Sequence, residues 1–62
     1  MTGLDFRVIR VRLGLSQEHM GDLLGASRQV ILRIERKQKV PRVYELAVKQ
    51  LVTERQSLNV AA

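Results

Sequence analysis

Two short segments, each a glycine followed two positions later by a serine, limit how this chain can fold. They are Gly14-Leu15-Ser16 and Gly25-Ala26-Ser27. Glycine adopts the positive φ that ends many helices without steric cost, and serine caps a helix start by accepting from a free backbone N–H. The spacing predicts a helix of only about two turns between the segments. A further helix begins directly after Ser27, so these two helices form a tight corner.

The residues before and between these turns have helical apolar spacing. A first helix is expected from about Leu4 to Leu13, with its inward stripe at Phe6, Ile9 and Leu13 and with Val8 and Val11 outside the stripe. A second helix follows Ser16, and the residues expected on its apolar face are Met20, Leu23 and Leu24. Both helices therefore offer one face to a shared core.

A third helix is expected from Arg28 to about Arg36. Its inner face would hold Val30, Ile31 and Ile34, and its outer face Arg28, Gln29, Leu32, Arg33 and Arg36. Pro41 suits the first turn of a fourth helix that ends at about Arg55. The expected stripe of that helix is Val43, Leu46, Ala47, Gln50 and Leu51. Residues 57–62 have no clear periodicity and are expected to form a tail, with Leu58 and Val60 as its candidate contacts.

Length and composition limit the chain to one small helical domain. With 62 residues it has room for a single domain, expected over residues 1–56. Phe6 and Tyr44 are its only aromatic residues, so Leu, Ile, Val and Met must form the core. The expected fold is all-α, a compact bundle of four or five short helices.

Several classes of protein are not indicated. No apolar run approaches the roughly 18 residues needed to span a bilayer, and the N-terminal residues do not have the pattern of a secretory signal. There is no cysteine, which agrees with a cytoplasmic location, and the sole histidine, His19, has no partner at metal-ligand or catalytic spacing. We therefore expect no membrane association, no enzymatic activity, no cofactor and no bound metal.

Positive charge is concentrated in one stretch of the chain. The net charge is +5, and the stretch from Arg28 to Arg42, with six basic residues and the single acid Glu35, carries all of it. Such a run is either a solvated face or a surface for a polyanionic partner. The spacing of apolar residues and glycines in the helices decides between these two interpretations.

Two short helices that cross at a corner need a small residue where their backbones approach and apolar residues on both inner faces. Gly21 is the small residue, Gly25 supplies the left-handed turn that the corner also needs, and the apolar residues are Met20, Leu24, Ala26, Ile31 and Ile34. In a generic helical hairpin Gly21 would only destabilise its helix, by about 1 kcal/mol relative to alanine. The pattern therefore favours a helix-turn-helix over a generic hairpin.

Three segments carry a resemblance to a known family. Leu13-Gly14-Leu15-Ser16-Gln17, Gly25-Ala26-Ser27-Arg28-Gln29 and Arg33-Ile34-Glu35-Arg36, at their joint spacing, resemble the Cro and phage-repressor helix-turn-helix family over about Phe6 to Leu51. The resemblance implies a lambda-repressor-like bundle, a homodimer on a palindromic operator and a role in transcription control. It also implies a bacterial protein, or one encoded by a phage or plasmid, that acts in the cytoplasm on the nucleoid.

The resemblance places base-reading residues at the start and outer face of the third helix, at Arg28, Gln29, Leu32 and Arg33. Their chemistry agrees, because Arg can donate to O6 and N7 of guanine and Gln can pair with N6 and N7 of adenine. For Arg28 and Arg33 the alternative is plain phosphate contact. Leu32 stands where the family usually has a polar residue, so it contacts a thymine methyl, another protein or nothing.

Phosphate contacts are expected around this helix. By the resemblance, Gln17 meets a phosphate at the start of the second helix, with a solvated first-turn residue as the alternative. The basic residues that flank the third helix and would bind phosphates are Arg36, Lys37, Lys39 and Arg42. Affinity from such contacts falls steeply with salt and carries no sequence information.

By the same resemblance Arg10 and Glu35 form a partly buried salt bridge between the first and third helices. Two residues depart from the family pattern. Lys37 replaces a glycine common after the third helix, which leaves the turn there open, and Gly21 replaces the usual alanine, which is expected to loosen the second helix.

The expected partner is double-stranded DNA, bound by a homodimer, because one recognition helix reads only a few base pairs and two-fold symmetry spaces two helices about 34 Å apart. The expected dimer interface is the end of the fourth helix with the tail, including Val52 and Leu58. The alternative function is an antitoxin-like module whose C-terminal segment binds a protein and which also binds DNA.

Overall fold

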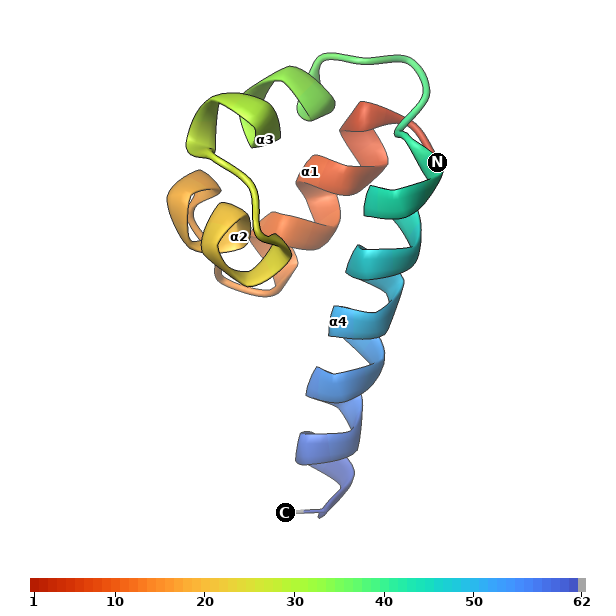
Figure 1. Cartoon of the computed structure of the whole chain (residues 1–62). Helices are drawn as coiled ribbons and strands as arrows, with labels where there is room; N and C mark the ends of the chain where they lie inside the picture. The colour runs from red at the N-terminus through yellow and green to blue at the C-terminus, as the bar shows by residue number, and fades with distance from the viewer. Residues whose placement is uncertain (62) are drawn as a thin grey trace.

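Four helices account for the architecture. The computed structural model describes the backbone of residues 1–61 and the side chains of residues 1–55. Over these residues the chain forms helices and no strand: α1 (Gly3–Arg12), α2 (Gln17–Leu24), α3 (Arg28–Glu35) and α4 (Arg42–Ala61). Figure 1 shows α1 in the middle, with α2 and α3 on one side and α4 on the other. The all-α compact fold is as the sequence predicts.

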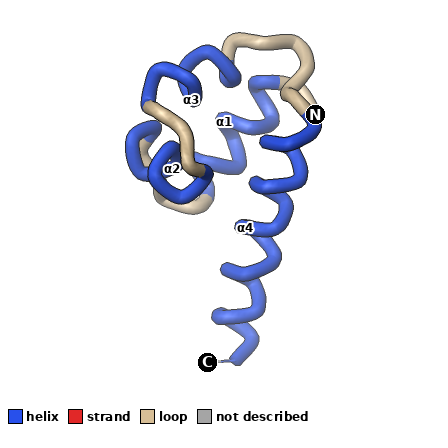
Figure 2. The backbone as a smooth tube through the Cα atoms, in the orientation of Figure 1, coloured by secondary structure: helices blue, strands red, loops and turns tan. Residues whose placement is uncertain are grey.

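The glycine and serine segments act as predicted. The Ser16 hydroxyl accepts from the His19 N–H at 3.0 Å, and the Ser27 hydroxyl accepts from the Val30 N–H at 3.2 Å. Gly14 and Gly25 have φ values of 72° and 70°, in the left-handed region that glycine enters freely. Short connections therefore separate α1, α2 and α3 in the tube view of Figure 2.

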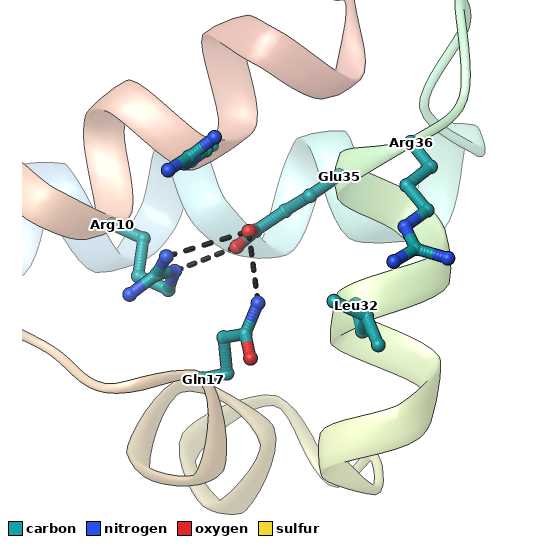
Figure 3. Close-up of a pocket in the computed structure, with 6 residues that line it drawn as sticks. Arg10, Gln17, Leu32, Glu35 and Arg36 are labelled. Atoms are coloured by element: carbon teal, nitrogen blue, oxygen red, sulfur yellow. Dashed lines mark hydrogen bonds and ion pairs between the residues drawn. The ribbon is translucent and has the colours of Figure 1, made fainter.

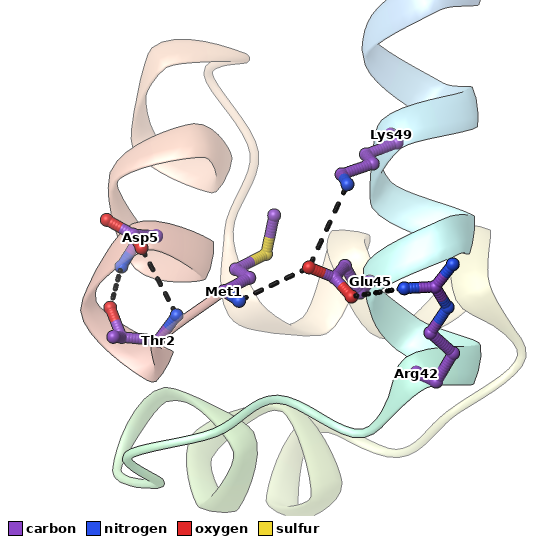
Figure 4. Close-up of polar contacts among 6 residues, drawn as sticks. All are labelled: Met1, Thr2, Asp5, Arg42, Glu45 and Lys49. Carbon is purple, nitrogen blue, oxygen red and sulfur yellow. Dashed lines mark hydrogen bonds and ion pairs between the residues drawn. The ribbon is translucent and has the colours of Figure 1, made fainter.

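The first helix begins one residue earlier than predicted, at Gly3. Thr2 and Asp5 form a capping box in which the Thr2 hydroxyl accepts from the Asp5 N–H and the Asp5 carboxylate accepts from the Thr2 N–H, both at 3.1 Å (Figure 4). The backbone hydrogen bond from Thr2 lowers the pKa of Asp5 below its ordinary value. The signal was present as a threonine three residues before an aspartate, a pattern that the periodicity alone does not include.

The core draws on all four helices and two of their connections. Phe6, Met20, Ile31 and Val48 are fully buried, one from each helix, and the remaining buried apolar side chains are Leu15, Ile34 and Val40. Leu15 and Val40 lie in the connections, where their burial holds the loops against the helices. Aliphatic side chains thus fill the core around a single phenylalanine, as the composition predicts.

The predicted faces of α2 and α4 were wrong in part. Leu23 is 49% exposed, and Val43 and Leu46 are 74% and 51% exposed. The side of α4 that meets the core is formed by Val48, with Tyr44 and Leu51 half-buried, and of these only Leu51 belongs to the predicted stripe. Apolar residues on several faces of α4 give two overlapping stripes, so spacing alone could not select the buried one.

The fourth helix is longer than predicted. It continues to Ala61, past the expected end near Arg55 and through most of the expected tail, because no glycine or proline follows Pro41. Pro41 lies just before the first turn, and its carbonyl accepts from the Tyr44 and Glu45 N–H groups. The contacts expected of Leu58 and Val60 lie outside the described side chains. No helix in the described part of the chain is long and apolar enough to cross a membrane.

Candidate nucleic-acid interface

Helix α3 has one fixed face and one open face. Ile31 and Ile34 are buried with 0% and 2% of their surface exposed, which fixes the rotation of the helix about its axis. The polar residues of the opposite face, Arg28, Gln29, Arg33 and Arg36, are all exposed. The division of this helix is therefore as predicted, except at Leu32.

The connection after α3 extends the open face. Lys37 and Lys39 are exposed there, and Arg42 is exposed at the start of α4, so every basic residue from Arg28 to Arg42 is accessible to solvent. The chain leaves α3 through a tight turn, with the Lys37 N–H donating to the Ile34 carbonyl at 3.1 Å. Among the described residues only glycines have positive φ, so Lys37 needs no left-handed backbone. The sequence did not predict the geometry of this turn, and the structure shows that it accommodates a lysine at position 37.

Glu35, the one acid in this stretch, is withdrawn from the surface. Its side chain is 5% exposed, and its carboxylate accepts from Arg10 Nε at 2.6 Å and from Arg10 Nη2 at 3.4 Å. Arg10 also donates from Nη1 to the Leu15 carbonyl at 2.8 Å, which fixes the guanidinium in place. The salt bridge expected from the family resemblance is present, and it leaves only positive charge exposed along α3.

Gln17 is the first residue of α2 and is half-buried. Its Nε2 donates to Glu35 Oε1 at 3.3 Å, so the side chain points toward the salt bridge (Figure 3). Gln17 therefore links α2 to the salt bridge between Arg10 of α1 and Glu35 of α3, a role that was not predicted. Its contact with a phosphate stays a prediction.

A shallow pocket between α1, α2 and α3 brings several of these groups together. Its lining consists of Arg7, Arg10, Gln17, Leu32, Glu35 and Arg36. Leu32 is half-buried on its wall, so it is less exposed than the predicted reading face required. Arg7 is exposed at this pocket and was missed by the sequence reasoning. Its signal was its position three residues before Arg10, which puts both on one side of α1.

Two glycines allow the close approaches that position these elements. A Cβ on Gly3 would lie 2.5 Å from the Lys37 carbonyl oxygen and 2.6 Å from that of Glu35. A Cβ on Gly21 would collide with the Ala26 carbonyl oxygen. The expectation that Gly21 loosens α2 relative to alanine was therefore wrong, since this packing has no room for an alanine side chain.

No family model matches the chain, and no curated protein or solved structure shows significant similarity to it. The resemblance to the Cro and phage-repressor family rests on the residues quoted for it, and a function must be argued from the surface itself.

Proposed function

We propose that the protein is a sequence-specific DNA-binding protein that uses α2 and α3 as a helix-turn-helix, with α3 in the major groove. The observation that carries the proposal is the exposed surface from Arg28 to Arg42, where six basic side chains are accessible and Glu35 is paired with Arg10. DNA presents a dense array of phosphates, so a surface of one sign gains affinity through release of counterions. Because Glu35 is paired with Arg10, the residues from Arg28 to Arg42 expose no acid.

The exposed residues of α3 supply the proposed base contacts. Arg28, Gln29 and Arg33 project from the open face of a helix whose inner face is fixed by the core. Arg and Gln have the donor and acceptor geometry to read guanine and adenine, each good pair discriminating by about 1–3 kcal/mol. Leu32, half-buried beside them, is proposed to contact a thymine methyl at the edge of the same surface.

The proposed phosphate contacts surround α3. They come from Gln17, Arg36, Lys37, Lys39 and Arg42, with the addition of Arg7 from the pocket between α1 and α3. Because these groups lie on both sides of the reading face, they would set the register of the helix in the groove. A homodimer on a palindromic operator then doubles the contacts, and a repressor needs nothing more than occupancy of that operator.

Selection of bound DNA from a random pool of duplexes tests the proposal. We expect a short preferred half-site, and we expect Arg28→Ala, Gln29→Ala and Arg33→Ala each to change the preference at one position. Lys39→Ala should weaken all sequences about equally and reduce the salt slope by about 1. Arg55→Ala removes the same charge from exposed α4 and serves as the control. If all three α3 variants weaken binding equally for every DNA sequence, these residues contact phosphates and do not read bases.

A protein-binding role of α4 is the second candidate. The helix projects beyond α1, α2 and α3 in Figure 1, and a groove between α2 and α4 has apolar walls from Leu23, Leu24, Ala47 and Leu51. An antitoxin-like module would use such a segment to hold a toxin while α3 binds DNA. Co-purification with the product of the adjacent gene tests this role.

A further inference from the structure

Helix α1 has an exposed apolar stripe that the core does not use. Leu4, Val8 and Val11 are 65%, 42% and 60% exposed. Their spacing of four and then three residues places them on one face of the helix, opposite buried Phe6. The helix is covered by α3 on one side and by α4 on the other (Figure 1), so this face is its only open one among the described elements.

The two edges of the stripe differ in charge. Asp5 and Arg12 lie on the edge next to α4, where both line a pocket with Glu45 and Lys49. Arg7 lies on the opposite edge, at the pocket that α1 shares with α3. One edge therefore has an acid near its start and a base near its end, and the other edge has a base.

We propose that the protein forms a homodimer in which α1 packs antiparallel against α1 of a second copy. A two-fold axis near Val8 would place Leu4 on Val11 of the partner subunit and Val8 close to its own counterpart. The same axis brings like edges together, so Asp5 lies beside Arg12 of the partner subunit, and the reverse pair forms as well. A parallel pairing would instead bring opposite edges together, so Arg12 would lie beside the Arg7 edge of the partner subunit, which has no acid. Only the antiparallel pairing therefore gives both Asp5 and Arg12 an opposite charge on the partner subunit.

This axis also orients the proposed DNA-binding surface. Because like edges meet, the α3 helices of both copies lie on the same side of the dimer, with the two Arg7 side chains near the axis on that side. That consequence rests on the proposed function, whereas the dimer itself does not. The proposed interface lies on α1, whereas the sequence predicted the end of α4. Val52, one residue of that predicted interface, is half-buried.

The size of the stripe predicts a weak dimer. Three apolar side chains from each copy make a small interface, and interfaces of this class belong to transient assemblies. The two exposed ion pairs add orientation more than affinity. Bound DNA would strengthen the pairing, because phosphates neutralise the two Arg7 side chains near the axis.

Sedimentation equilibrium of the full chain without DNA tests the interface. We expect the wild type to dimerise with rising concentration and Val8→Glu to raise the dissociation constant at least about tenfold. The matched control is Val43→Glu, which changes a valine that is 74% exposed on α4. A wild type that stays monomeric up to about 1 mM overturns the proposal. So does loss of the dimer in Val43→Glu with no change in Val8→Glu.

A charge exchange tests the orientation. Arg12→Asp should weaken the dimer by placing two acids together, and the double variant Asp5→Arg with Arg12→Asp should restore it. The double variant also loses the capping box of Thr2, so circular dichroism should show a less stable monomer even as the dimer returns. No recovery of the dimer in a folded double variant contradicts the antiparallel pairing.

A single cysteine gives a direct readout of the axis. The chain has none of its own, so Val8→Cys can link only to the same residue of a second copy. Under mild oxidation we expect a disulfide-linked dimer from Val8→Cys and little from Val43→Cys. Equal cross-linking by both variants would overturn the proposal. Because neither measurement uses DNA, failure of the α1 interface would leave the DNA-binding proposal to its own test.

Discussion

Glu35 and Glu45 lie on opposite sides of α1, and each contacts positive groups: Glu35 contacts Arg10 of α1, and Glu45 contacts the N-terminus and two side chains of its own helix. Toward α3, Glu35 is held by the two-pronged contact with Arg10, with Nε at 2.6 Å, and by Gln17 at 3.3 Å. Toward α4, Glu45 faces the Met1 ammonium at 3.2 Å, Arg42 at 3.7 Å and Lys49 at 3.8 Å (Figure 4). The first contact is nearly buried and short, and the second is wider and is shared among the nearly buried Met1 ammonium and two exposed side chains of α4.

Backbone hydrogen bonds also differ between the side of α1 toward α3 and the side toward α4. On the α3 side, the Gly3 N–H donates to the Lys37 carbonyl at 2.8 Å, in an approach too close for any Cβ. The corresponding link to the start of α4 is made by the residues that precede α1, where the Val40 N–H donates to the Met1 carbonyl at 2.9 Å. The close approach at Gly3 thus ties α1 directly to the end of α3, the helix proposed to read DNA, whereas the hydrogen bond toward α4 joins Met1 and Val40, which lie outside both helices.

The largest effect should come from the α3 side. We expect Glu35→Ala to lower the free energy of unfolding by about 3 kcal/mol, because it leaves the largely buried Arg10 guanidinium without its partner. Urea unfolding followed by circular dichroism measures this loss. The double variant Arg10→Met with Glu35→Leu should recover part of it. A loss below about 0.5 kcal/mol for Glu35→Ala would place this pair in the same class as an exposed salt bridge.

Next comes the glycine at the start of α1. Gly3→Ala would push its methyl group against the Lys37 and Glu35 carbonyl oxygens, and we expect a loss of about 1–3 kcal/mol from the resulting shift. Thermal unfolding provides the measurement. An unchanged melting temperature would show that the contact between α1 and the end of α3 can widen without cost.

A smaller effect, with a pH dependence, is expected on the α4 side. The hydrogen bond from the Met1 ammonium lowers the pKa of Glu45. The folded state therefore binds this proton less readily than the unfolded state, so the contribution is complete above the ordinary pKa and is lost as pH falls through the lowered one. Unfolding of the wild type and Glu45→Gln should differ near pH 6 and converge toward pH 3. A difference that grows with acid would contradict this sign.

The smallest effect is a difference in salt response. Ions screen exposed charges over about 10 Å at 0.1 M salt and affect buried pairs much less. Added sodium chloride should therefore reduce the stability difference between the wild type and Glu45→Gln while leaving the effect of Glu35→Ala nearly unchanged. Unfolding curves at low and high salt measure both, and an equal response would remove the distinction between the two sides of α1.

The sequence anticipated the features that depend on local chemistry. The caps at Ser16 and Ser27 and the turns at Gly14 and Gly25 follow from hydrogen bonding and backbone freedom within a few residues. The inner face of α3 followed from spacing because every residue outside that face except Leu32 is polar. The salt bridge between Arg10 and Glu35 came from the family resemblance, since no local rule joins residues so far apart.

Features that depend on distant elements escaped the sequence reasoning. Which face of α4 is buried depends on where α1 and α2 meet it, and apolar residues on several faces left that choice open. The position of Arg7 beside the α3 pocket and the close approach at Gly3 likewise depend on how α1 crosses α3. Each of these is a consequence of packing between elements rather than of the residues within one.

By itself the sequence determined the caps and turns that separate the first three helices, the aliphatic composition of the core, and the concentration of positive charge between Arg28 and Arg42. Only the tertiary structure decided that Glu35 is withdrawn from that surface and that Leu4, Val8 and Val11 are left without a partner on α1. The physical reason is range. Capping and periodicity act within about one helical turn, whereas burial depends on which faces of separate helices meet.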